Sequence, residues 1–95
     1  MDKKKRRLGK EWLGEIRFTD AVVRKLRLEH NLTPAQVKTA IALGAHDWAK
    51  WHDHEVYGRR LIVGGSDEES TMVAYLRPID RPEGIWQCLT AWRTT

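Results

Sequence analysis

The sequence predicts an α+β fold with a short N-terminal strand, a two-helix hairpin and an antiparallel meander of three to four strands. Three observations support this prediction. Residues 15–20 alternate charged and apolar side chains, as a half-buried strand does. Residues 20–45 contain two helical patterns, and from residue 55 the apolar runs are short and separated by polar turns. Helices followed by consecutive antiparallel strands pack on one face of a sheet, so its other face is expected to be partly open.

Each predicted helix has its own start signal. The first helix is expected over residues 21–31, after a cap at Thr19 or Asp20. Asn31 is its expected end, because asparagine tolerates the left-handed conformation. The second helix lies within residues 32–45, with an exit at a glycine, and starts with a capping threonine, a proline and a capping-box glutamine, namely Thr33, Pro34 and Gln36.

The C-terminal half is expected to form strands. The predicted strands cover residues 55–65, 71–78 and 85–93, with Gly58 as a bulge or turn. Residues 48–54 are expected to be an exposed connector from the helical hairpin. Strict alternation in the last strand places four side chains on one face, those of Trp86, Cys88, Thr90 and Trp92.

Charge divides the chain into a basic leader, residues 1–12, and a single domain, residues 13–95. The net charge of +4 arises from residues 1–10, which carry +5, whereas residues 11–95 sum to −1. A basic arm can add phosphate affinity that does not depend on base sequence, or it can be a solvated leader. Nucleic-acid binding by the domain itself therefore requires its cations to be clustered.

Several functional classes are excluded or disfavoured. One cysteine, Cys88, allows no internal disulfide, and no apolar run approaches the roughly 20 residues of a membrane span. The N-terminus has no signal-peptide pattern, so a cytoplasmic protein with no membrane role is expected. No nucleotide fingerprint is present and no cofactor is expected. His52 and His54 with Glu55 offer an incomplete ligand set, so no metal site is predicted and a solvated polar loop is the alternative.

The motifs Glu55-Val56-Tyr57-Gly58-Arg59, Tyr75-Leu76-Arg77 and Ala91-Trp92-Arg93, after a capped helical hairpin, resemble BrnT-type toxins of the RelE-like ribonuclease group. The resemblance covers about residues 15–95. It implies a RelE-like α+β fold and a metal-independent endoribonuclease that cleaves mRNA, the toxin of a bacterial type II toxin–antitoxin module. It also implies a cognate antitoxin, a small DNA-binding protein.

RNA cleavage needs a base, an acid and cations that stabilise the phosphorane. Arg77 and Arg93 are the expected phosphate ligands, because each lies where an apolar strand ends, and arginine matches phosphate geometry. His54 or Glu55 is the expected catalytic base. Further RNA contacts are expected from Arg59, Arg60 and His30. Surface ion pairs are the alternative role for any of these arginines.

Five tryptophans are more than a 95-residue domain needs for its core. Trp48 and Trp51 are expected to project together and stack on bases, or to pack over the edge of the hairpin. Trp86 and Trp92 are expected in the core. A non-catalytic module that binds protein or nucleic acid on the same scaffold remains the alternative function.

Overall fold

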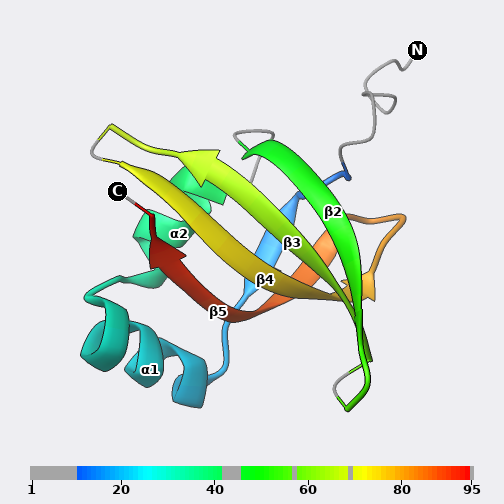
Figure 1. The fold of residues 1–95 in the computed structure, drawn as a ribbon, viewed down its shortest axis with the longest axis horizontal. Coiled ribbons are helices and arrows are strands. Elements are labelled where there is room, and N and C mark those ends of the chain that lie inside the picture. The colour runs from blue at the N-terminus through cyan, green and yellow to red at the C-terminus, as the bar shows by residue number, and fades with distance from the viewer. Residues whose placement is uncertain (1–10, 42–45, 57, 69, 95) are drawn as a thin grey trace.

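The structure, a computed structural model, describes residues 11–41, 46–56, 58–68 and 70–94. It is an α+β fold of two helices and one five-stranded mixed sheet (Figure 1). The elements are β1 (Glu15–Arg17), α1 (Asp20–His30), α2 (Pro34–Ile41), β2 (His46–His54), β3 (Gly58–Ser66), β4 (Thr71–Asp80) and β5 (Ile85–Arg93). The strand order is β1-β5-β4-β3-β2, with β1 parallel to β5 and all other pairs antiparallel. The predicted α+β class with two helices is confirmed, whereas the RelE-like fold stays an expectation from the resemblance.

The predicted helix boundaries are confirmed at their caps. Thr19 Oγ1 accepts a hydrogen bond from the Val22 N–H at 3.2 Å, and Asn31 is left-handed at φ 55°. In α2 the Thr33 N–H donates to Gln36 Oε1 at 2.9 Å, and the Gln36 N–H donates to Thr33 Oγ1 at 3.2 Å. This reciprocal pair satisfies N–H groups that the helix itself leaves open. The predicted glycine exit, Gly44, lies outside the described residues.

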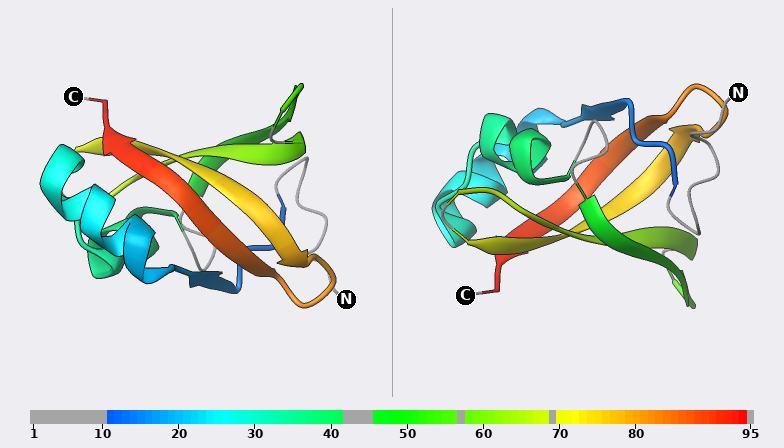
Figure 2. Two further views of the ribbon diagram at one scale, coloured as in Figure 1. Left: turned by 90° about the horizontal axis from the view of Figure 1, so that it is seen from below. Right: turned by 90° about the horizontal axis from the view of Figure 1, so that it is seen from above.

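Both helices lie on one face of the sheet (Figure 2). α1 packs on β5, and α2 packs on β3 and β4. The core lies between these layers and contains fully buried side chains from every part of the fold except β2, among them Ile16, Leu26, Val37, Ile41, Leu61, Val63, Met72, Leu76 and Trp86. The opposite face of β2–β5, called the open face below, carries no described helix.

Residues 11 and 12 belong to the fold, although the sequence placed them in the leader. The Glu11 carboxylate accepts two hydrogen bonds of 3.0 Å from Arg81. The Trp12 carbonyl accepts the indole N–H of the buried Trp86 at 2.9 Å. Residues 1–10 lie outside the described part of the chain.

The predicted connector over residues 48–54 is instead the edge strand β2. It pairs with β3 from His46–Gly65 to His54–Gly58. Its backbone hydrogen bonds come from this pairing, so its charged composition does not prevent strand formation. Charged side chains are common on sheet edges, where they oppose pairing with other chains. Gly58 begins β3 at φ 81°, consistent with the predicted turn glycine.

The alternation predicted for β5 is wrong after Cys88. Tyr75 pairs with Thr90 while the next residue, Leu76, pairs with Cys88, so Leu89 is an extra residue in β5. Such a β-bulge shifts the side-chain alternation by one position. Trp86 and Cys88 are therefore buried in the core, whereas Trp92 turns to the open face.

We predict that Gly65→Ala lowers the free energy of unfolding by about 1–3 kcal/mol, the range for overpacking. A Cβ at Gly65 would lie 2.0 Å from the Ala40 carbonyl oxygen of α2, so the helix must move. Gly64→Ala is the matched control. There the Cβ would meet the side chain of Trp48 at 2.2 Å, and a half-exposed side chain can rotate away. Denaturant melts that rank Gly64→Ala as the more damaging change would contradict this packing.

Candidate functional site

Three rows of side chains cross the open face at right angles to the strands. Each row takes one residue from each of β2, β3, β4 and β5, and neighbouring rows are about 7 Å apart along the strands. The arginine row is His52, Arg60, Arg77 and Gln87. The middle row is Lys50, Ile62, Tyr75 and Thr90. The tryptophan row is Trp48, Gly64, Val73 and Trp92.

The arginine row places two guanidinium groups on neighbouring strands. In the antiparallel β3–β4 register, Arg60 and Arg77 lie one position beyond the Leu61–Leu76 pair. Arg77 donates to Gln87 Oε1 at 2.6 Å, and the Arg60 guanidinium lies 4.8 Å from the ring centroid of Tyr75. His52 pairs with Arg60 from the edge strand. The row is therefore a line of polar and cationic groups with an aromatic ring beside it.

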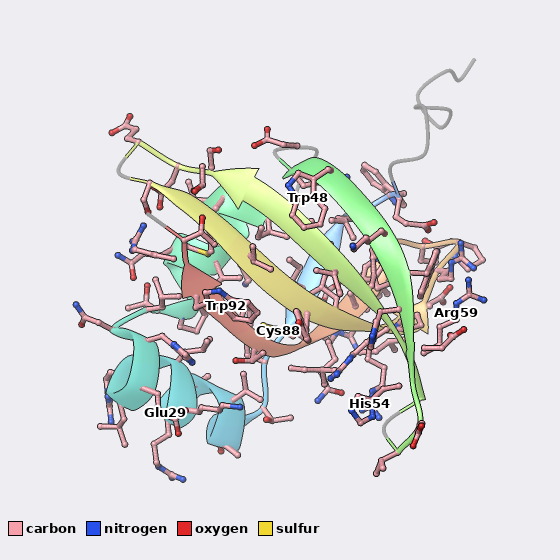
Figure 3. All side chains as sticks on the ribbon, viewed as in Figure 1. Glu29, Trp48, His54, Arg59, Cys88 and Trp92 are labelled. Carbon is pink, nitrogen blue, oxygen red and sulfur yellow. The ribbon has the colours of Figure 1, made fainter. Side chains whose placement is uncertain are left out.

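The tryptophan row has an indole near each end. Trp48 is 43% exposed and lies over β2 and β3 in Figure 3. Trp92, on β5, contacts Tyr75 with ring centroids 5.2 Å apart. With the Arg60–Tyr75 contact, this makes a continuous series of planar groups in contact over β3, β4 and β5.

Arg77 and Arg93, the expected pair of phosphate ligands, are not brought together. Arg93 pairs with Met72, five residues before Arg77 on β4, so the two positions are about 17 Å apart along the strand. Met72 is buried under the helices, which puts Arg93 on the opposite face from Arg77. Arg93 donates to Ser70 Oγ at 2.6 Å and lies 3.3 Å from the Asp67 carboxylate, so it ties β5 to the β3–β4 loop.

His54 and Glu55 lie at the β2–β3 turn. His54 is at the end of β2, far from Trp48 at the start of that strand in Figure 3. Its Nδ1 accepts the Val56 N–H at 3.1 Å, a contact local to the turn. The His54 ring is 6.3 Å from that of His52. Glu55 is exposed and has no hydrogen bond or ion pair with any residue that the structure describes.

Trp51, Arg59 and His30 lie away from the open face. Trp48 and Trp51 do not project together, because positions three apart in a strand face opposite sides. The guanidiniums of Arg59 and Arg81 lie 4.7 and 4.8 Å from the centroid of the Trp51 ring, which also packs on Trp86. Arg59 is also 3.7 Å from Asp53, the expected alternative of a surface ion pair. His30 ends α1 on the helical side, 4.0 Å from Glu29.

The open face also contains residues that the sequence prediction did not include. Lys50, His52, Tyr75, Gln87 and Trp92 were not assigned to a nucleic-acid site. Two of them, Lys50 and His52, are exposed and follow Trp48 at every second position, so a strand assignment for residues 46–54 would have grouped the three on one face. The position of Trp92 depends on the bulge at Leu89, for which we find no sequence signal.

Cys88 is fully buried, and burial raises the pKa of its thiol from 9.0 to about 12, opposed by a backbone hydrogen bond to Thr90 and by Lys25. A neutral, inaccessible thiol is a poor nucleophile. Among the described residues, no three His, Cys, Asp or Glu side chains gather as metal ligands. No helix in the described ranges is long and apolar enough to cross a membrane.

No family model, curated protein or solved structure matches this chain. The resemblance to BrnT-type and RelE-like toxins therefore stays an expectation from short motifs.

We predict that Cys88 makes the protein less stable in alkaline solution. A folded-state pKa raised above 9.0 favours the native state below pH 9, and this contribution is lost between pH 9 and about 12. The difference in unfolding free energy between wild type and Cys88→Ala should shrink by about 1.4 kcal/mol per pH unit above 9. Denaturant melts from pH 8 to 10.5 measure this difference. A difference that stays constant with pH would contradict the assignment.

Proposed function

We propose that the protein binds a nucleic-acid strand on the open face of its sheet, with Arg60 and Arg77 contacting phosphate groups. This corresponds to the non-catalytic alternative that the sequence left open. The observation that carries the proposal is the arginine row itself. It combines guanidiniums at adjacent positions of β3 and β4 with a histidine and the half-buried amide of Gln87, and such groups are phosphate ligands in protein–nucleic acid complexes.

The electrostatics of the row support an anionic ligand. Residues 11–95 carry a net charge of −1, so Lys50, Arg60 and Arg77 on one face are a local excess and not a reflection of bulk charge. Like charges opposite each other on neighbouring strands destabilise a sheet. A bound phosphate backbone offsets this repulsion and turns the row into a source of affinity.

The proposal is tested with the double variant Arg60→Gln/Arg77→Gln. It is expected to bind a fluorescein-labelled RNA at least tenfold more weakly than wild type. The slope of log affinity against log salt concentration should fall by the amount that corresponds to about two phosphate contacts. Fluorescence anisotropy between 50 and 200 mM salt measures both quantities.

The matched control is Arg24→Gln/Arg27→Gln, which removes the same charge from the exposed side of α1. It should bind close to wild type. Thermal unfolding must show that both variants fold. Equal losses in the two variants would refute the open face as the binding site. Loss only on deletion of residues 1–10 would move the binding to the leader.

A second candidate function is that of the expected toxin, a metal-independent endoribonuclease of the cytoplasm held inactive by a cognate antitoxin. His52 favours it, because this side chain stands beside Arg60 in the arginine row and 6.3 Å from His54. Histidine can take and give protons near neutral pH, and an adjacent guanidinium can stabilise the phosphorane. Two nearby histidines can divide the roles of base and acid.

For this candidate, we expect wild type to cleave an mRNA in EDTA and His52→Asn to lose at least a hundredfold in rate, the usual contribution of general acid–base catalysis. His30→Asn, on the helical side, is the control and should cleave at the wild-type rate. Gel analysis of 5′-labelled RNA measures both. RNA that stays intact with wild type leaves binding as the function.

A further inference from the structure

The Trp48 indole packs on Gly64 of β3, where any larger residue would displace it. A Cβ at Gly64 would lie 2.2 Å from the indole Cε2 and Nε1 atoms and 2.5 Å from Cζ2. The ring therefore lies directly against the backbone of β3. With 43% of the residue exposed, the indole is supported from below and accessible from the solvent side. Such a ring is pre-organised as a stacking surface, because little side-chain entropy is left to lose on binding.

Trp92 provides the second stacking surface. The Tyr75 and Trp92 rings touch at a 60° tilt, which holds the indole on the open face. Arg60 lies over Tyr75 in turn, so it joins Trp92 to the arginine row through direct contacts. The two tryptophans are on β2 and β5, three strand spacings or about 14 Å apart.

We propose that the ligand of the open face is a single-stranded nucleic acid that runs across the β-strands, with bases stacked on Trp48 and Trp92 and phosphates along the arginine row. This inference rests on the proposed function and specifies its substrate class. A duplex hides the faces of its bases, whereas unpaired bases can stack on aromatic side chains.

The layout of the open face supports this assignment over a protein partner. Cations form one row and indoles another, separated by about 13 Å along the strands. A nucleic-acid strand has the same division, with its charge on one side and its apolar rings on the other. Val73, between the two tryptophans in their row, is half-buried and leaves no charge in the path of the bases.

The test uses the full chain and 12-nucleotide U-rich RNA, the same sequence as DNA, and a matched duplex. Trp48→Leu and Trp92→Leu are each expected to weaken single-strand binding about 5- to 150-fold, the range for loss of one base–aromatic stack. Gly64→Ala, which displaces the indole from β3 but retains Trp48, should weaken single-strand binding as much as Trp48→Leu does. Trp12→Leu is the control, because Trp12 is 52% exposed but lies outside the sheet.

The expected result is binding of the 12-nucleotide single strands at least tenfold tighter than of the duplex. Tighter binding of RNA than of DNA would indicate a contact with the 2′-hydroxyl, and equal affinity would indicate that the site accepts both. Either outcome supports the inference. Duplex binding as tight as single-strand binding, or wild-type affinity in both tryptophan variants, would overturn it. In that event, weaker RNA binding by Arg60→Gln/Arg77→Gln would still support the proposed function. Normal RNA binding by that double variant would contradict the proposed function itself.

Discussion

The extra residue Leu89 in β5 decides which side chains the sheet presents to solvent. Without it, strict alternation would send Trp92 into the core with Trp86 and Cys88. The bulge lets β5 bury Trp86 at one end and turn the half-buried Trp92 to the open face at the other. It also turns Arg93 to the helical side, where it anchors the β3–β4 loop and cannot join Arg77. The bulge therefore adds Trp92 to the open face and removes Arg93 from it.

One-sided burial leaves the open face without a described helix on it. The helices supply enough apolar surface to cover a single face, and the contact between Ala40 and Gly65 sets how closely α2 approaches β3. The other face keeps its polar and aromatic side chains in place through mutual contacts, such as Arg60 on Tyr75 and Arg77 on Gln87. Binding residues held on rigid strands, not loops, lose little freedom when a ligand arrives.

The sequence predicted the fold class and helix caps because capping depends on local residues such as Thr33 and Gln36. It missed β2, since an edge strand with few β-branched residues is stabilised by pairing that only the tertiary fold supplies. The site was predicted in part: Arg60, Arg77 and Trp48 lie on the open face. The grouping of Arg77 with Arg93 failed because a bulge is a property of strand pairing and not of local sequence.

Binding of a single strand on the open face can be followed residue by residue by ¹⁵N-HSQC titration of the protein with a short single-stranded oligonucleotide. We expect shifts of the indole N–H signals of Trp48 and Trp92 and of the amides around Arg60 and Arg77. The indole N–H of Trp86, buried and bonded to the Trp12 carbonyl, should not move. Shifts confined to α1 or to residues 1–10, with both open-face indoles unchanged, would contradict the account.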